Sequence, residues 1–238
     1  MLPAARGNFF GVTWRVALVV AVLSALVAGC DSESARVVTG ELAGRQRAEL
    51  DVVSGADTVT VRAADLGDEL FRASSPFGAR VVPVAAVTGS AVRVSLTDSG
   101  GAGPADVVVE LNSKVAWRIR LDGGAKQARV VLAGGRLTGL DFGAGNARID
   151  AELPAPRGTV PVRMAGGASV FDLRVPREAV TQVRIAGGAG SVTIDGTVHT
   201  GISGGTVYTP PDWPTATDRY LIDNTAGVST LTLARTAR

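Results

Sequence analysis

Apolar and polar residues alternate along most of this chain. In residues 115–122 every second side chain is large and apolar, and the side chains between them are mostly charged. Shorter stretches of the same alternation occur at 50–52, 59–62, 92–97, 149–153, 171–175 and 231–233. Such alternation predicts strands with one buried and one exposed face. No window of a dozen residues shows the period of an amphipathic helix, so the sequence predicts an all-β protein.

A short motif recurs in the second half of the chain. It has strand-favouring residues at its first and third positions and two glycines at its fifth and sixth. Clear copies start at Ile119, Val130, Val162 and Val183, and a weaker copy starts at Thr200. The starts lie 11, 32, 21 and 17 residues apart, close to multiples of about 10 or 11. This spacing is typical of repeat proteins whose units stack on a shared core.

We therefore predict a single β-solenoid of stacked short strands. Two strands with their turns make a rung of about 21 residues, and each Gly-Gly pair turns the chain onto the next layer. Short strands at this spacing also fit a β-sandwich. The recurrence of Gly-Gly pairs at one phase of the repeat favours the solenoid.

The first 29 residues have the features of a secretory signal peptide. They contain two arginines and no acid, and an apolar run at 16–27 is broken only by Ser24. The run is shorter than the 20 or so residues that span a bilayer. It ends in Val27-Ala28-Gly29-Cys30, which resembles the lipobox of bacterial lipoproteins. That resemblance implies cleavage before Cys30 and a diacylglycerol on its sulfur; the alternative is a signal anchor with an incidental cysteine.

The remainder divides into a linker and the repeating body. Residues 30–46 lack a sustained period, so we expect a lipid-anchored flexible linker there and the solenoid over 47–238. The irregular segment 65–78 predicts a loop. The proline-rich segment 208–214 predicts an excursion over the end or flank of the solenoid, followed by strands near 220–223 and 228–233. Cys30 is the only cysteine, so the body has no internal disulfide.

The charge of the chain argues against a nucleic-acid partner. The 238 residues have a formal net charge of +2, and the two arginines of residues 1–29 account for it. From Cys30 onward 22 basic residues balance 22 acidic ones. A basic patch for phosphate backbones is therefore not predicted, and we expect no nucleic acid among the partners.

Three arginines are the candidate ligand-binding residues. Arg120, Arg163 and Arg184 hold the same position in three copies of the motif, so stacked rungs would align them in a row. Arginine binds phosphate and carboxylate through two parallel hydrogen bonds, which would suit wall polymers or lipid headgroups. The alternative is an ordinary solvated face that acidic residues neutralise, namely Asp150, Glu152 and Asp172.

The sequence predicts no catalytic residue, metal site or cofactor. Residues 201–205 match the G-x-S-x-G nucleophile motif, but that motif needs a helix after the turn and a histidine later in the chain. The only histidine, His199, precedes Ser203, which occupies the turn position before a Gly-Gly pair. The Gly-rich segment 98–106 lacks the dense oxygen ligands of a calcium loop.

The Gly-Gly-Ala turns at 123–125, 166–168 and 187–189, together with the terminal pattern at 213–228, resemble the toast-rack and adhesin-type β-solenoid families of bacterial envelope proteins. The resemblance covers about residues 47–233. It implies a role at the cell surface, sometimes beside envelope-stress signalling, and supplies no catalytic residue.

We therefore expect a non-enzymatic lipoprotein on the extracytoplasmic side of the cell membrane. It would contact the membrane through its lipid anchor and act as an interaction module for a cell-wall polymer or an envelope protein. The alternative is an envelope-sensing or regulatory subunit of a membrane signalling system.

Overall fold

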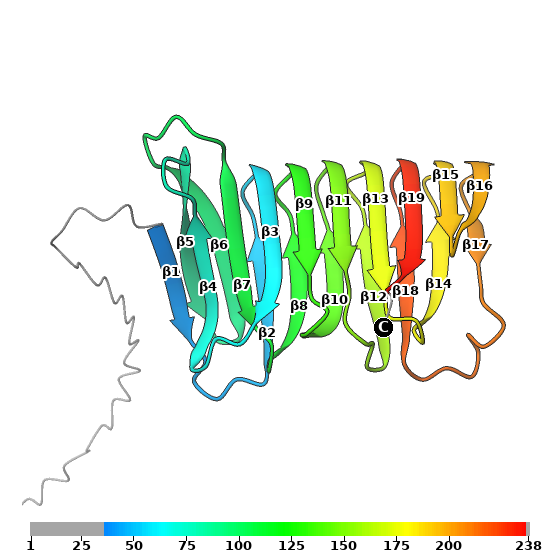
Figure 1. Cartoon of the computed structure of the whole chain (residues 1–238), viewed down its shortest axis with the longest axis horizontal. Helices are drawn as coiled ribbons and strands as arrows, with labels where there is room; N and C mark the ends of the chain where they lie inside the picture. Colours follow the sequence, from blue (N-terminus) through cyan, green and yellow to red (C-terminus); the bar gives the residue numbers. More distant parts are fainter. Residues whose placement is uncertain (1–35, 237–238) are drawn as a thin grey trace, which may run out of the picture. The chain divides into compact units, whose positions relative to one another are not determined.

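The computed structural model describes residues 36–236, and within that range all regular structure is β-strand. The 19 strands form two sheets that face each other (Figure 1). Sheet A contains, in spatial order, β1 (Arg36–Glu41), β4 (Glu69–Ser75), β7 (Asp106–Asn112), β3 (Ala56–Ala64), β9 (Ala125–Val131), β11 (Asn146–Glu152), β13 (Ala168–Val175), β19 (Val228–Arg235), β15 (Ala189–Ile194) and β16 (Thr197–Ile202). Sheet B contains β17 (Thr206–Tyr208), β14 (Val180–Ile185), β18 (Arg219–Asn224), β12 (Thr159–Met164), β10 (Arg136–Phe142), β8 (Ala116–Leu121), β2 (Arg47–Val52), β6 (Ala91–Asp98) and β5 (Val81–Thr88).

One strand of sheet B and the following strand of sheet A make a rung, and neighbouring rungs pair in parallel. Ile119 of β8 pairs with Leu140 of β10, which pairs with Val162 of β12, so successive rungs repeat every 21 or 22 residues. The all-β class, the stacked solenoid and its rung length are confirmed. Among residues 36–236 no helix is long and apolar enough to cross a membrane.

The core lies between the two sheets and is built from rows of inward apolar side chains. One row of sheet B is fully buried in every rung: Val92, Leu50, Ile119, Leu140, Val162, Ile222 and Val183. Phe142, which is two residues beyond Leu140 in sheet B, meets Phe171 of sheet A edge to face, with ring centroids 5.7 Å apart. Since each side chain is covered only when the neighbouring rungs are present, the stack folds as a unit.

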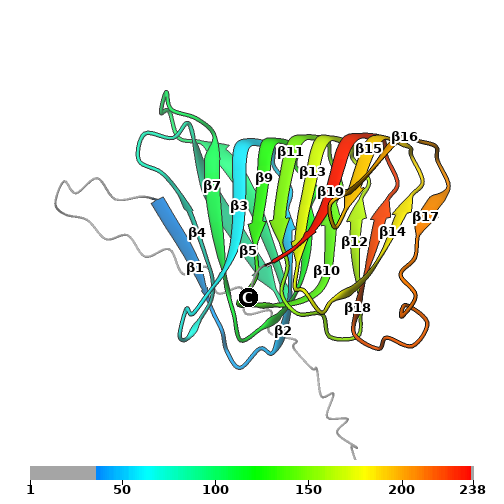
Figure 2. The ribbon, with the colours of Figure 1, turned by 45° about the vertical axis from the view of Figure 1, so that its right-hand side comes forward.

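Two rungs do not follow the order of the sequence. The β2–β3 rung lies between β6–β7 and β8–β9, and the β18–β19 rung lies between β12–β13 and β14–β15. Figure 2 shows this insertion, with the red β19 between β13 and β15. The expectation that each Gly-Gly pair turns the chain onto the next layer is also wrong. The pairs at 123–124, 166–167 and 187–188 join the two strands of one rung, whereas the pair at 134–135 leads to the next rung. The first and last rungs of the chain are internal to the stack.

Steric fit at the corner between the sheets explains this order. A Cβ on Gly123 would lie 2.0 Å from the carbonyl oxygen of Ser54, and one on Gly166 would lie 1.9 Å from the carbonyl carbon of Ala144. Through the stack, glycines alternate with residues that carry a Cβ: Ser54, Gly123, Ala144, Gly166, Ala226 and Gly187. The inserted rungs supply Ser54 and Ala226, so at this position of the corner every glycine faces a residue with a Cβ. The following position is glycine in all six rungs, from Gly55 to Gly188.

The Gly-Gly pairs do not all occur at this corner. Gly134 and Gly135 form the turn at the opposite edge, between β9 and β10. Gly204 and Gly205, in the turn from β16 to β17, instead lie beside the corner of β14, where the Gly205 amide donates to the Ile185 carbonyl at 2.7 Å. The corner repeat instead includes 143–145 and 225–227, where alanine replaces the first glycine of the pair. The motif copy that starts at Val130 is therefore out of phase with the others.

Antiparallel strands close both ends of the stack. At the first end β1 pairs with β4, β4 with β7 and β5 with β6, and at the other end β15 pairs with β16 and β14 with β17. Two expectations are corrected here. Residues 36–41, assigned to the linker, form β1, and half of the predicted loop 65–78 is β4. The consecutive apolar residues Leu70 and Phe71, both fully buried, break the alternation that marks the other strands.

Replacing Gly166 with alanine should destabilise the fold by about 3 kcal/mol, because its Cβ would overlap the backbone of Ala144. Gly134→Ala is the matched control: no atom lies within 4 Å of its Cβ position, so the change should be neutral or stabilise by up to about 1 kcal/mol. Guanidinium unfolding measures both. Equal effects of the two substitutions would contradict the packing at this corner.

Candidate binding surface

The outward face of sheet B carries a row of charges that alternate in sign from one rung to the next. We call it the charged row; in spatial order it consists of Arg93, Asp51, Arg120, Asp141, Arg163, Asp223 and Arg184. Adjacent members are partners in the strand register, so they lie about 4.8 Å apart along the stack. The alternation follows from the rung order, since the inserted rungs contribute Asp51 and Asp223.

The predicted arginines Arg120, Arg163 and Arg184 all lie in the charged row. They do not form an uninterrupted cationic stripe, because Asp141 and Asp223 stand between them.

The acidic residues proposed to neutralise this face lie elsewhere. Asp150, Glu152 and Asp172 belong to β11 and β13 of the opposite sheet. There Arg148 contacts the carboxylates of Asp150 at 2.7 Å and Asp172 at 2.5 Å.

The three aspartates of the row were not predicted, although the sequence contains a signal for them. In the copies at Leu50, Leu140 and Ile222 an aspartate follows the first residue, where the arginine copies have Arg120, Arg163 or Arg184. All six copies have a glycine five positions after their first residue. A search for that single glycine would have found both types of rung.

Ion pairs occupy only part of the charged row. Arg93 contacts Asp51 at 3.3 Å, Arg118 contacts Asp141 at 2.8 Å, and Arg120 turns to Asp122 at 2.7 Å. Among residues 36–236, Arg163, Asp223 and Arg184 have no ion pair. The half of the row toward β14 therefore offers two exposed guanidinium groups and one carboxylate to a partner.

A shallow hollow of about 280 Å³ lies over the middle of the row. It is lined by Arg118, Arg120, Arg163, Glu49, Asp122 and Asp141, with the backbone of the adjoining corner. Because Arg118 and Arg120 already bind carboxylates, Arg163 is the guanidinium free to bind an incoming carboxylate or phosphate by two hydrogen bonds.

The other candidate residues do not assemble into a reactive site. Ser203 lies in the turn from β16 to β17, where its carbonyl accepts a hydrogen bond from the Thr206 hydroxyl at 2.8 Å, and a strand follows it rather than a helix. His199 packs against Tyr208 with ring centroids 4.9 Å apart. In the Gly-rich segment the Asp98 carboxylate accepts the Gly100 amide at 2.6 Å.

Two further expectations concern a metal and the lipid anchor. Over the part of the chain that the structure describes, no three His, Cys, Asp or Glu side chains are grouped to hold a metal ion. Cys30 lies outside the described residues, so its lipidation remains a prediction.

Comparison with known proteins supports the fold and identifies no family. No protein-family model matches the chain, and no curated protein sequence does. A solved structure of a candidate cell adhesion protein from Clostridium sporogenes is similar over 85% of this chain and 99% of that one, with a TM-score of 0.63 and 14% identity. A candidate adhesin from Bacteroides fragilis covers 84% of this chain and 98% of its own, but its TM-score of 0.27 and 9% identity support no conclusion. At 14% identity the first likeness shows a shared fold alone.

Carboxylates on the outer surface of sheet A have altered proton affinities. The side chain of Lys126 and the amide of Ala105 hold the pKa of Asp57 below its ordinary value, with Arg80 adding to the effect. Arg148 lowers the pKa of Asp150 in the same way, assisted by Gln127. Both groups therefore stay ionised in the folded chain at a pH where the unfolded chain has begun to bind protons.

Acid should therefore weaken the fold in a defined range. A lowered pKa stabilises above the unfolded value of about 3.9 and stops doing so as the pH falls through the folded pKa. We expect the free energy of unfolding to be nearly constant from neutral pH to about pH 5 and to fall below about pH 4. In Asp57→Asn the decline should be shallower. Urea unfolding across the pH range measures it, and an unchanged slope would contradict the assignment.

Reversing the charge of one member of the charged row should create repulsion with the adjacent members and lower the free energy of unfolding. Asp223→Arg would place three cations in adjacent strands, so we expect a loss of about 1 kcal/mol at low salt. Because exposed charges are screened, the loss should shrink in about 1 M salt. Asp68→Arg is an exposed control outside the row and should change stability little. A salt-independent loss would point to packing instead of charge.

Proposed function

We propose that this chain is a non-enzymatic, lipid-anchored surface module that binds an extended anionic polymer or protein segment of the cell envelope. The observation that carries the proposal is the charged row with its free guanidinium groups at Arg163 and Arg184. A partner with carboxylates or phosphates about 10 Å apart would match arginines on every second strand.

The shape of the folded body favours an extended partner over an enclosed small molecule. Over the outward faces of the two sheets, the described residues line shallow hollows of about 280 and 320 Å³. This is the lower end of the range for small-molecule sites. Neither surrounds its contents, and the residues of the one hydrolase-like motif lie in a turn and an edge strand. These features support binding rather than catalysis.

The stacked architecture also suits a surface role. Ten strands in sheet A extend over about 43 Å at the usual spacing, so one end of the stack can present binding groups well away from the other. The resemblance of residues 1–29 to a secretory signal peptide and of residues 27–30 to a lipobox supports attachment to the membrane through Cys30. The adhesion-type description of the Clostridium sporogenes structure agrees with such a role.

Charge reversal on sheet B tests the binding face. The double substitution Arg163→Glu with Arg184→Glu should weaken binding to isolated envelope polymer by about tenfold or more, because each lost charged hydrogen bond is worth roughly 1.5–3 kcal/mol. Neither side chain has an ion pair in the described part of the chain, so stability should change little.

The matched control makes the same charge change on the opposite face. Arg129→Glu with Arg174→Glu alters two exposed arginines of sheet A that line the hollow there. Co-sedimentation with purified envelope compares the two variants. If both variants bind as tightly as the unsubstituted chain, the proposed face is refuted. If both lose binding to the same extent, only the total charge matters, and the proposed face is refuted as well.

A further inference from the structure

Exposed apolar side chains gather at the ends of the stack and are almost absent from its flanks. At the end that contains the first described residue, Val37 is 49% exposed, Phe77 69%, Val84 47% and Val87 42%. These residues lie on β1, on β5 and on the loop that follows β4. At the opposite end only Val198 and Val207 are comparable, and Val131 is the single case between the ends within residues 36–236.

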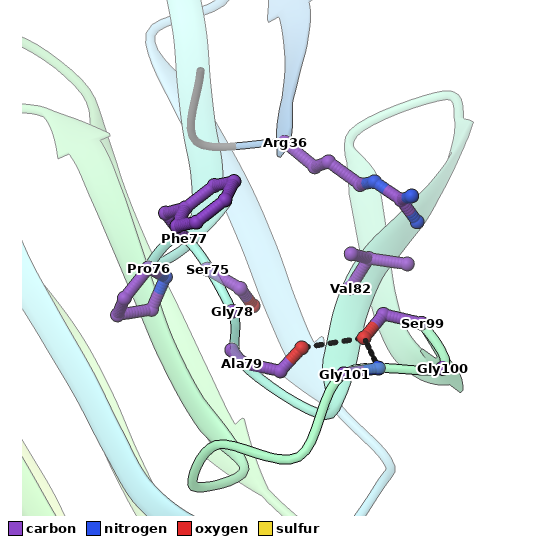
Figure 3. A pocket seen from close by; sticks show the side chains of 10 residues that line it. All are labelled: Arg36, Ser75, Pro76, Phe77, Gly78, Ala79, Val82, Ser99, Gly100 and Gly101. Atoms are coloured by element: carbon purple, nitrogen blue, oxygen red, sulfur yellow. Dashed lines mark hydrogen bonds between the residues drawn. The ribbon is translucent and has the colours of Figure 1, made fainter. Parts of the chain in front are cut away.

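A hollow of about 310 Å³ lies beside Phe77 at this first end (Figure 3). The side chain of Arg36 reaches over one side of it, above Val82 and Ser99, while the Phe77 ring stands on the other side. The lining includes one cation, Arg36, and no acidic residue. Among the described residues Arg36 has no ion pair or hydrogen bond through its side chain.

Ser75 adds an unsatisfied donor to this hollow. It lines the hollow, it is 2% exposed, and its hydroxyl has no hydrogen-bond partner within the described structure. The nearby Ser99 hydroxyl is already used, because it donates to the Ala79 carbonyl and accepts the Gly101 amide. A buried hydroxyl without a partner loses free energy that an acceptor oxygen would restore.

The length of the preceding chain limits where this end lies in an anchored protein. Cys30 is six residues before Arg36. Even fully extended, six residues span only about 20 Å. An acyl-anchored Cys30 would therefore hold Arg36, and with it the hollow and Phe77, close to the bilayer surface.

We propose that this end of the stack, formed by β1, β5 and the loop after β4, docks on the bilayer that holds the lipid anchor. This inference rests on the proposed lipid attachment at Cys30. The Phe77 ring enters the interface between headgroups and acyl chains, where aromatic side chains are favoured. Arg36 binds a headgroup phosphate through two hydrogen bonds, and the Ser75 hydroxyl donates to the same group. The stack then stands upright, with its charged row running away from the membrane.

Site-specific fluorescence on the whole exported chain tests this arrangement. Acylation occupies Cys30, so an added cysteine is the only free thiol. An environment-sensitive fluorophore at Val37→Cys should be quenched by a lipid-borne quencher in vesicles that contain phosphatidylglycerol. The same fluorophore at Val198→Cys, at the opposite end, should remain in water. An unquenched fluorophore at Val37→Cys on an acylated chain would overturn the proposal.

Substitutions in the hollow identify the groups responsible. Phe77→Asp and Arg36→Glu should each reduce quenching at Val37→Cys to the level at Val198→Cys, and Ser75→Ala should reduce it partly. Val207→Asp removes an exposed apolar side chain from the opposite end and should have no effect. All the substituted residues except Ser75 are exposed, so the variants should fold. Comparing the thermal unfolding of each variant with that of the unsubstituted chain verifies this. Full quenching in both Phe77→Asp and Arg36→Glu would refute the assigned contacts.

Other occupants of this end give different results. If a second copy covered it, both fluorophores would change with protein concentration in the absence of lipid. If the hollow bound a soluble anion, excess inorganic phosphate would remove the quenching. Either result would contradict docking on lipid. Mass analysis of the mature amino terminus tests lipid attachment separately, because absence of the acyl group refutes the anchor and not the lipid affinity of this end.

Discussion

The close approach of neighbouring backbones at the corner between the sheets is the constraint on which the structure depends. There is no room for two side chains at the same height, so a glycine in one rung faces a residue with a Cβ in the next. The charged row has the same period of two rungs, with arginine on the glycine rungs and aspartate on the others. Steric fit at the corner and charge pairing in the row therefore specify the same neighbouring rungs. Such agreement between packing and electrostatics favours a single order of rungs in the stack.

This constraint accounts for the position of the chain's first and last rungs. If the rungs followed the order of the sequence, the β12–β13 and β14–β15 rungs, which both carry arginine, would be neighbours. Gly166 would then face Gly187, and the space at the corner would be left unfilled. The last rung separates them and is held by Tyr220, which is fully buried and donates to the Pro154 carbonyl at 2.7 Å. Burial raises the pKa of Tyr220, so the hydroxyl remains a donor. Antiparallel strands are then left to close both ends, where open parallel edges would invite further pairing.

Much of the fold follows from local sequence, but the order of the rungs does not. Alternation and the glycine motif together identified most strands and the rung length, because each strand within the stack has one apolar face and each rung repeats the same turn. The positions of β2 and β18 depend on partners far away in sequence, and only the Ser54 and Ala226 corners signal them. The strand β1 was missed because none of its side chains is buried, so it has no apolar face, and β4 was missed because Leu70 and Phe71 break the alternation. Likewise, the row of arginines was predictable from repeat position, whereas the intervening aspartates required the spatial order.

The alternation also determines how the charged row interacts with a partner. The fields of opposite charges about 4.8 Å apart cancel at distances greater than the two-strand repeat of the row. Salt screens the remaining field over about 8–10 Å. The face of sheet B therefore exerts little long-range electrostatic attraction on a charged partner. This agrees with the equal numbers of basic and acidic residues from Cys30 onward. At contact the field is strong and changes sign from strand to strand. Selection on this face consequently depends on whether the charges of a partner match the strand spacing, more than on how many it carries.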